Sequence, residues 1–320
     1  QRGISVATSV LAYEYKGLKI NILDTPGHKD FAEDTYRTLT AVDSVIVVID
    51  VARGVEEQTE KLVEVCRMRN IPIIVFINKL DREGRDAFDL FDEIEQKLGL
   101  KITPLSHPIG MGYDFKGIYN IWEQNVNLFT GDPRKDIEET IEIDDLSNPD
   151  LDTLIGESAA ETLRDEVELS TGVYPKFDKE EYLAGNLHPV FFGSALNNFG
   201  VRELLDCFID IAPPPQPKES DTRLVYPNEP EMTGFVFKIH ANMDPKHRDR
   251  LAFVKIVSGT FERNKPYLSV RQDRMIRFSS PNAFFAEKKE IVDVSYPGDI
   301  IGLHDTGNFK IGDTLTEGEL

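Results

Sequence analysis

The stretch that decides the predicted fold lies at residues 18–28 and reads Leu18-Lys19-Ile20-Asn21-Ile22-Leu23-Asp24-Thr25-Pro26-Gly27-His28. Its first six residues are mostly apolar and predict a buried strand of a parallel sheet. Such a strand would carry Asp24 to the carboxyl edge of the sheet, where open α/β folds bind ligands and where a carboxylate can hold Mg²⁺ through water. The Pro26-Gly27 pair predicts a tight turn whose Gly27 N–H could meet a phosphate, with His28 projecting into the same crevice. An ordinary turn sequence is the alternative interpretation of this motif taken alone.

Strands and helices alternate through the first two thirds of the chain. Apolar periodicity predicts strands at residues 44–49, 71–77 and 189–192 and helices at residues 31–42, 54–69, 88–98 and 200–211. The first of these strands consists largely of β-branched residues, which predicts a central position in the sheet. Residues 6–23 predict a β-hairpin at the sheet edge that turns at Lys16-Gly17. The alternation predicts an α/β domain with a mostly parallel sheet.

Two changes of composition mark the predicted domain organisation. The span from about residue 110 to residue 187 contains a short aromatic stretch followed by acidic helical material. We interpret the whole span as an insertion. The run Pro213-Pro214-Pro215-Gln216-Pro217 cannot continue a helix and is typical of a stiff spacer. Short apolar runs separated by Gly, Pro and Asn turns then predict an all-β barrel. We therefore expect an α/β domain at residues 1–212, a Pro-rich linker at 213–232 and a β-barrel domain at 233–320.

Composition excludes several classes of protein. The chain has 320 residues of which 40% are hydrophobic, and this indicates folded domains rather than a disordered tail. No apolar run approaches the roughly 18 residues that span a bilayer, so we expect no membrane partner. Cys66 and Cys207 lie far apart in helix-like stretches, which favours a reduced, cytoplasmic setting. A net charge of −20 argues against non-specific wrapping of nucleic acid, because Lys and Arg supply that affinity.

A second polar motif, Asn78-Lys79-Leu80-Asp81, follows the strand predicted at residues 71–77. A carboxylate such as Asp81 can accept hydrogen bonds from the N1–H and 2-amino groups of guanine, whereas adenine lacks the amino group. Asn78 would brace the pocket and bind the base edge, and the stem of Lys79 would pack over the ring. The alternative is an ordinary turn with an exposed aspartate. The motif predicts a guanine site.

A third motif, Gly193-Ser194-Ala195-Leu196, follows the strand predicted at residues 189–192. The backbone N–H groups of Ser194 and Ala195 could meet O6 of guanine. This signal is weak alone, but three such motifs at three predicted strand ends would rarely arise from independent turns.

Together with Arg2-Gly3-Ile4-Ser5, these motifs resemble the translational GTPases. Two further stretches, residues 33–43 and 242–250, resemble the bacterial peptide chain release factor 3 family more than elongation factor G. The resemblance covers nearly the whole chain. It implies a P-loop-type GTPase domain followed by a translation-factor barrel. It also implies a GTPase that acts with the ribosome, through ribosomal RNA and proteins, and recycles class I peptide chain release factors after peptide release.

The resemblance also implies roles for individual residues. His28 would be the catalytic residue that orients the attacking water, and Gly27 would sense the γ-phosphate. Asp24 and Ser5 would hold Mg²⁺. The residues expected to bind GTP or GDP are Asp24, Thr25, Pro26, Gly27, His28, Asn78, Lys79, Leu80, Asp81, Ser194, Ala195 and Leu196.

The sequence departs from the family in one respect. The phosphate-binding motif G-x-x-x-x-G-K-[ST] is absent, because no Gly-Lys pair occurs in the chain. The family also continues past the barrel with a further domain. We therefore expect an internal fragment, with a GTPase domain incomplete at its N-terminus, that binds GTP poorly and does not hydrolyse it by itself. The alternatives are another translational GTPase, such as an elongation factor G-like or ribosomal protection protein, or a ribosome-binding module that does not hydrolyse GTP.

Overall fold

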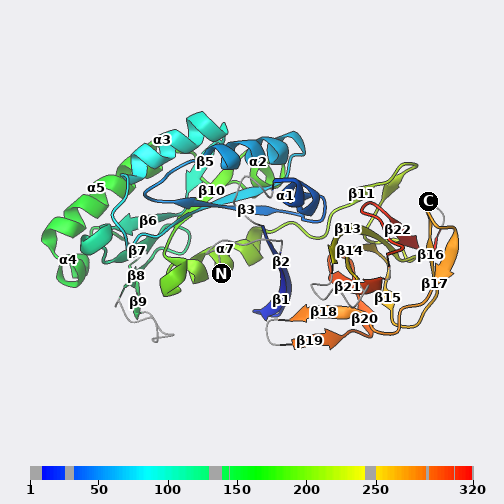
Figure 1. Ribbon diagram of the computed structural model, residues 1–320. Coiled ribbons are helices and arrows are strands. Elements are labelled where there is room, and N and C mark those ends of the chain that lie inside the picture. The colour runs from blue at the N-terminus through cyan, green and yellow to red at the C-terminus, as the bar shows by residue number, and fades with distance from the viewer. Residues whose placement is uncertain are drawn as a thin grey trace. The chain divides into compact units, whose positions relative to one another are not determined.

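The structure is a computed structural model that describes residues 9–25, 32–129, 139–143, 145–241, 250–285, 288–305 and 307–318. The chain forms two compact units, one made of Ser44–Ala212 and the other of Gln1–Asp43 together with Pro213–Leu320. We describe each unit by itself (Figure 1). Within the described ranges, no helix combines the length and apolar character that a bilayer crossing requires.

A four-stranded parallel sheet forms the centre of the Ser44–Ala212 unit, in the order β3-β4-β10-β5. Its strands are β3 (Val45–Asp50), β4 (Ile73–Asn78), β10 (His188–Phe192) and β5 (Ile102–Pro104). β4 and β10 are almost completely buried, as expected of central strands. β3 lies at the edge of this sheet, with Ile46 39% and Val48 56% exposed. Residues 44–49 were predicted to form a central strand, and among the described strands this prediction is wrong. A β-branched composition indicates a strand but not its position within the sheet.

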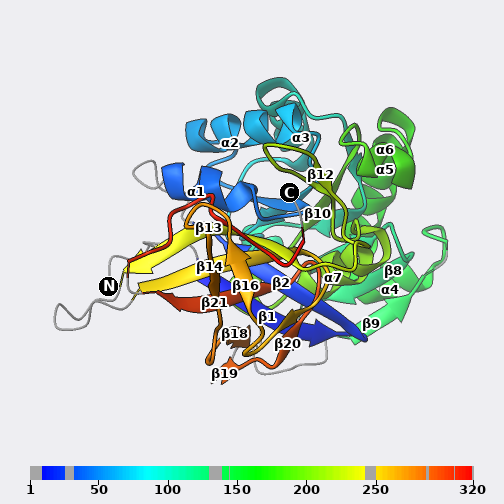
Figure 2. The ribbon, with the colours of Figure 1, turned by 90° about the vertical axis from the view of Figure 1, so that its right-hand side faces the viewer.

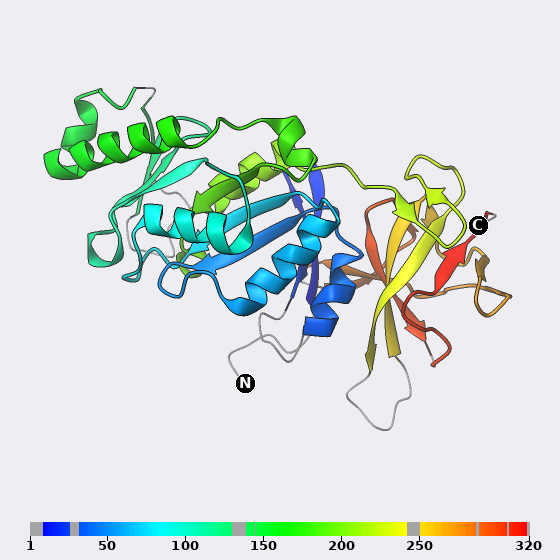
Figure 3. The same cartoon turned by 90° about the horizontal axis from the view of Figure 1, so that it is seen from above.

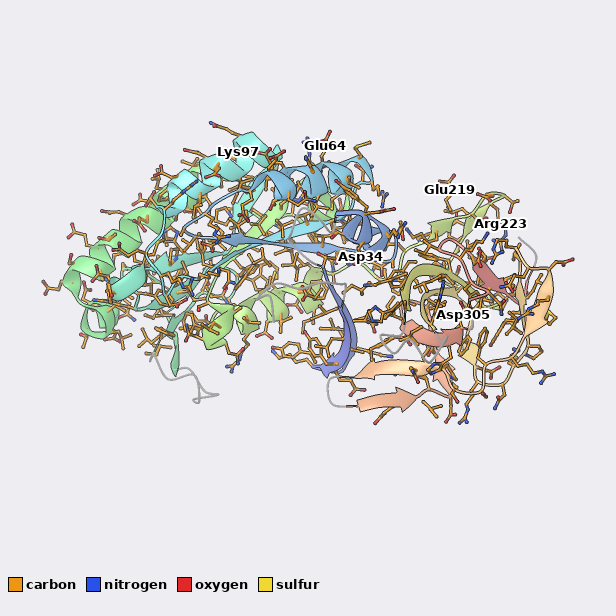
Figure 4. The ribbon with its side chains drawn as sticks, viewed as in Figure 1. Asp34, Glu64, Lys97, Glu219, Arg223 and Asp305 are labelled. Carbon is orange, nitrogen blue, oxygen red and sulfur yellow. The ribbon has the colours of Figure 1, made fainter. Side chains whose placement is uncertain are left out.

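Helices cover both faces of this sheet. They are α2 (Glu57–Met68) and α3 (Ala87–Leu98) on one face and α7 (Val201–Ile211) on the other (Figure 1). The face under α7 is built from Ile74 and Phe76 of β4 packed against Leu204 and Cys207 of the helix. The apolar spacing that predicted the three helices is the spacing of their buried residues. Charged residues such as Glu64 and Lys97 lie on the outer sides of α2 and α3 (Figure 4).

The predicted insertion contains a second sheet that the acidic composition did not indicate (Figure 3, cyan to green). Four antiparallel strands pair in the order β6-β7-β8-β9: β6 (Ser106–Ile109), β7 (Gly117–Asn120), β8 (Asn125–Leu128) and β9 (Glu139–Glu142). Helices α4 (Asp150–Ile155), α5 (Glu157–Val173) and α6 (Lys179–Leu183) follow. Leu151 and Leu163 of α4 and α5 pack on Tyr119 and Val126 of the sheet. The prediction of mainly helical material here is thus incomplete, because short strands leave little periodicity.

The other unit is built on a curled, mostly antiparallel sheet in the order β17-β16-β22-β13-β14-β21-β18-β1-β2, with β19 paired to β18 (Figure 2). The longer strands are β1 (Ser9–Tyr15), β2 (Leu18–Asp24), β13 (Thr233–Ala241), β14 (Arg250–Ser258) and β21 (Ile300–Asp305). The shorter ones are β11 (Lys218–Glu219), β12 (Leu224–Val225), β15 (Phe261–Glu262), β16 (Tyr267–Ser269), β17 (Arg274–Ile276), β18 (Asn282–Phe285), β19 (Lys288–Ile291), β20 (Val294–Ser295) and β22 (Thr314–Thr316).

This unit's core consists of alternate residues of these strands. Val236, Val254, Tyr267 and Leu315 belong to one buried cluster. The predicted fold class is confirmed, since an α/β domain with a parallel sheet is followed by a β-rich domain.

The hairpin of β1 and β2 turns at Lys16 and Gly17, which have φ values of 47° and 80°, as the sequence predicted. The hairpin belongs to the curled sheet and not, as predicted, to the edge of the parallel sheet. β2 pairs antiparallel with β1, whose other edge meets β18. Leu18 is 49% and Ile22 39% exposed, so β2 is not covered on both faces. The prediction that residues 18–23 form a buried strand of the parallel sheet is wrong, because four apolar residues among six do not distinguish a central strand from a hairpin edge.

Helix α1 (Ala32–Leu39) and the segment after it are attached to β13 and β14 by buried lysines. Nζ of Lys255 lies 3.0 Å from Oδ2 of Asp43 and donates to the carbonyl oxygen of Ala41 at 2.8 Å. Nζ of Lys238 lies 3.4 Å from the carboxylate of Asp34, which is labelled in Figure 4. Burial lowers the pKa of Lys238, and the Asp34 carboxylate opposes this shift. Two buried ammonium groups thus hold this segment on the sheet.

Candidate guanine-nucleotide site

Two loops meet at one edge of the parallel sheet in the Ser44–Ala212 unit. β4 ends at Asn78 and its parallel neighbour β10 ends at Phe192, with Ile77 opposite Phe192 in the register. The loops that follow contain the Asn78–Asp81 and Gly193–Leu196 motifs, and they leave the sheet at its carboxyl edge. This is where open α/β sheets bind ligands.

Side-chain hydrogen bonds connect the two loops directly. Ser194 Oγ donates to Asp81 Oδ1 at 2.7 Å, and the N–H of Ala195 donates to Asn78 Oδ1 at 2.8 Å. Asn197 Nδ2 donates to Ser194 Oγ at 2.9 Å, so this buried hydroxyl is both donor and acceptor. A carboxylate has about four lone-pair positions, so Asp81 can still accept further hydrogen bonds. The loops are held together by the residue types expected to bind the base.

The peptide groups of Leu80 extend this connection to the insertion. Its N–H donates to the carbonyl oxygen of Gly193 at 3.2 Å, and its carbonyl oxygen accepts from the N–H of Gly112 at 3.1 Å. Gly112 lies in the 3₁₀ turn Gly112–Asp114, and a second such turn, Ala195–Asn197, forms part of the base-side loop. The side chain of Leu80 is completely buried. Leu80 therefore joins the loops after β4 and β10 to the loop that enters the insertion.

A glycine is required where these loops come closest. A Cβ placed on Gly193 would lie 2.3 Å from the carbonyl oxygen of Phe199, which no side chain can tolerate. The glycine lets the chain turn back so that Ser194 and Phe199 exchange two backbone hydrogen bonds of 2.8 and 2.9 Å. The resulting tight loop presents the N–H of Ala195 toward Asn78.

Asp50 is a site residue that the sequence reasoning missed. It ends β3, opposite Asn78 in the register, and its Oδ2 lies 2.9 Å from Nζ of Lys79. Its other oxygen accepts from the N–H groups of Ala52 and Arg53. Burial alone would raise the pKa of Asp50, but the hydrogen bonds from Lys79 and the two N–H groups lower it. A charged residue at the end of a strand beside the Asn78–Asp81 motif was the available signal.

The backbone of Lys79 has a φ of 72°, in the left-handed region that side chains with a Cβ rarely adopt. The Asp50 contact fixes the direction in which its long side chain leaves this strained position. Lys79 keeps 40% of its side chain exposed, which leaves its stem available to a ligand. Leu196 is 81% exposed on the opposite loop.

Removing the Asp50 charge should weaken nucleotide binding. Because an ion pair of this exposure contributes about 1 kcal/mol, we expect Asp50→Asn to lower affinity for GDP by about three- to tenfold. Titration of a fluorescent GDP analogue into the protein measures this. Glu64→Gln, an exposed carboxylate on α2, is the matched control, and an equal loss in both variants would contradict the role of Asp50.

The remaining predicted residues belong to the other compact unit or lie outside the described residues. Asp24 is the last residue of β2 and Thr25 follows it, both in the other compact unit. Asp24 is exposed there and lies opposite Ser9 in the hairpin. Pro26, Gly27, His28 and Ser5 lie outside the described residues. Among the residues with described positions, no group of three or more His, Cys, Asp or Glu side chains could hold a metal ion. Asp24 alone does not make a Mg²⁺ site, so that assignment remains a prediction from the resemblance.

Comparisons with known proteins give the family and the fold of the chain. A family model described as elongation factor Tu GTP binding domain matches residues 1–214, and one described as elongation factor G domain 2 matches residues 231–318. A crystal structure of a protein from Thermus thermophilus is similar over 99% of this chain, with 20% identity and a TM-score of 0.76. At this identity the likeness shows the fold alone. The match covers 47% of that protein's chain, so this chain spans about half its length. Since the first family model covers well over half of the 320 residues, the chain belongs to the translational GTPases of the elongation factor Tu and elongation factor G type.

Proposed function

We propose that this chain is part of a cytoplasmic GTPase of translation termination, of the bacterial release factor 3 type. It binds GTP, hydrolyses it on the ribosome and recycles class I release factors. The observation that carries the nucleotide assignment is the pair of hydrogen bonds that joins Asp81 to Ser194 and Asn78 to Ala195. The termination role rests on the resemblance of residues 33–43 and 242–250 to that family.

Guanine fits the donors and acceptors of the joined loops. Asp81 accepts from the N1–H and 2-amino groups. The N–H groups predicted to meet O6 already donate elsewhere, that of Ser194 to the carbonyl oxygen of Phe199 and that of Ala195 to Asn78 Oδ1, so a bond to O6 would have to share or replace one of these. Adenine offers an acceptor at N1 and has no 2-amino group, so the half-buried Asp81 carboxylate would find no donor on the base and would keep only its bond from Ser194 Oγ. An unpaired buried polar group discriminates strongly between such analogues. The Lys79 stem, directed by Asp50, covers one face of the ring.

The catalytic roles come from the resemblance. His28 would orient the attacking water and Gly27 would sense the γ-phosphate. Asp24 and Ser5 would hold Mg²⁺, which would neutralise phosphate charge.

A second candidate function is that of an elongation factor G-like or ribosomal protection GTPase. The match of residues 231–318 to elongation factor G domain 2 supports this candidate as well as it supports the first. A ribosome-binding module without hydrolysis is the candidate from another class. The two GTPases differ in the ribosomal complex that stimulates their hydrolysis. The binding module differs from both because it does not hydrolyse GTP.

The test uses ribosomes that have released their peptide and still hold a labelled class I release factor. We expect the full-length protein with GTP to accelerate departure of that factor, and His28→Ala to bind nucleotide normally while losing about 10²-fold or more of the stimulated hydrolysis. Stimulation of tRNA translocation instead would support the elongation factor G-like function. Binding to ribosomes without any hydrolysis would support the binding module.

A further inference from the structure

A buried polar cluster lies between the insertion and helix α7, away from the nucleotide loops. Three asparagines on the β7–β8 hairpin and one glutamate on α7 form it: Asn120, Asn125, Asn127 and Glu203. All four residues are at most 8% exposed. Asn127 Nδ2 donates to Glu203 Oε1 across the interface between hairpin and helix. A carboxylate this deeply buried, with amides as its neighbours, calls for a partner.

The strand register places the asparagines on one face. Asn120 lies opposite Asn125, and Asn127 is two residues further along the same strand, so the three side chains point to the same side of the hairpin. The intervening residues Tyr119 and Val126 point to the other side and pack among the residues of α4 and α5. The asparagine face is therefore the one that meets α7.

Each member of the cluster keeps one polar atom without a hydrogen-bond partner among the described residues. These atoms are Asn120 Nδ2, Asn125 Oδ1, Asn127 Oδ1 and Glu203 Oε2. The partnered atoms fix their orientation, because Asn120 Oδ1 accepts from the N–H of Glu123 at 3.2 Å and Asn125 Nδ2 donates toward Glu123 Oε2 at 3.5 Å. With Glu203 ionised, the unpartnered set holds three acceptors and one donor, which cannot satisfy one another.

We propose that Glu203 carries a proton and that the cluster binds one buried water molecule. A carboxylic acid turns Oε2 into a donor, and the set then holds two donors and two acceptors. One water can accept from Asn120 Nδ2 and Glu203 Oε2 and donate to Asn125 Oδ1 and Asn127 Oδ1. Buried waters in proteins typically make about three such bonds and occupy polar sites of this kind. The proton and the water together satisfy all four atoms.

The burial of Glu203 favours its neutral form. Burial raises the pKa of Glu203, and the carboxylates of Asp206 on the same helix and Glu123 on the hairpin turn raise it further. A hydrogen bond from the backbone N–H of Glu203 and the neighbouring cation Arg202 oppose this shift without reversing it. A raised pKa in the folded state means that folding takes up a proton. The stabilisation is therefore present at low pH and is lost as the pH rises from the ordinary glutamate value of about 4.3 through the folded value.

The site connects two parts of the unit that are distant in sequence. Helix α7 follows directly after the loop that contains Ser194 and Ala195, and Asn127 belongs to the insertion. A neutral Glu203 thus secures the base-side helix to the insertion, whether or not the loop binds guanine. Failure of this proposal and failure of the nucleotide proposal are separate results.

Thermal unfolding between about pH 5 and pH 8 tests the proposal in nucleotide-free protein. Glu203→Gln keeps the shape and supplies an amide donor without a titrating proton. We expect the wild-type midpoint to fall relative to this variant by at least about 2 °C as the pH rises across that range. Asp210→Asn makes the corresponding change from carboxyl to amide at an exposed position on α7 and should follow the wild type. Parallel pH profiles for wild type and Glu203→Gln would overturn the proposal.

Two measurements hold even if Glu203→Gln folds poorly. Infrared spectra of the wild type, recorded as differences between successive pH values, should show the C=O band of a protonated carboxyl group. This band should remain at pH values well above the ordinary pKa of glutamate, and its frequency should shift in Asn127→Asp. Its absence would show that Glu203 is ionised. Midpoints in potassium, sodium and choline chloride of equal concentration should agree. If the midpoint of the wild type rose with only one small cation, and Glu203→Gln abolished that rise, Glu203 would be an ionised ligand of a bound cation and the proton assignment would be overturned.

Discussion

Asp81→Asn should convert the protein from a GTP binder into one that prefers xanthosine triphosphate. Xanthine carries an oxygen where guanine carries the 2-amino group, so an acceptor on the base faces the new amide donor of the variant. The carboxylate of the wild type accepts from both guanine donors, and the variant leaves one of them facing another donor. Sites of this kind reject the wrong analogue by about 10⁴-fold, so we expect the ratio of the two affinities to change by about 10³-fold or more.

The loop itself should survive this substitution. The side-chain amide in Asp81→Asn would retain an oxygen that can accept from Ser194 Oγ, as the Asp81 carboxylate does at 2.7 Å. Competition of both triphosphates against a fluorescent GDP analogue in the full-length protein measures the preference. Asp92→Asn, an exposed carboxylate on α3, is the control and should retain GTP preference. A variant at Asp81 that still prefers GTP would show that this carboxylate does not contact the base.

The second large effect concerns the unit with the curled sheet, where Asp43→Ala should lower the free energy of unfolding by about 2–4 kcal/mol. Breaking a buried pair leaves a charge uncompensated, which costs about 3–5 kcal/mol, and the Asp43 side chain is 24% exposed, which reduces that figure. Asp43 also accepts from the N–H of Gln216 at 3.0 Å, so a second donor loses its partner. Urea unfolding monitored by circular dichroism provides the measurement.

A double-mutant cycle separates the pair from the packing. Lys255→Met removes the ammonium group, and Asp43→Ala should cost much less in that background. Asp293→Ala, which breaks a contact of 3.4 Å to Arg263 at an 81% exposed carboxylate, should cost under about 1 kcal/mol. Equal losses at Asp43 with and without Lys255 would mean that the two residues are not energetically coupled.

Local patterns predicted the α/β elements well because periodic burial determines them. The helices α2, α3 and α7 and the strands β4 and β10 lie within a few residues of their predicted ranges. The partners of β2 could not be predicted in this way, since its apolar residues suit a hairpin edge as well as a buried strand. The short strands β6 to β9 were missed for a related reason, because four-residue strands carry almost no period.

The candidate site shows the same division. Residues 78–81 and 193–196 were recognised by their order and their place after strands, and the structure does bring them together. Asp50 was missed because it becomes a neighbour of Lys79 only through the pairing of β3 with β4. The contact between Asn127 and Glu203 joins residues that are 76 positions apart and carries no signal in a single sequence.

The position of Leu80 makes its backbone amide a natural reporter for the base site. Its N–H is hydrogen-bonded to Gly193 and its side chain is fully buried, so exchange of this hydrogen with solvent requires the two loops to separate. A single peak in an exchange-monitored spectrum would therefore follow the opening of the pocket without any ligand. The bond from Gly112 to the Leu80 carbonyl means that the same opening disturbs the insertion. Separation of Leu80 from the Gly193 loop or from the insertion would appear as faster exchange of the Leu80 amide hydrogen.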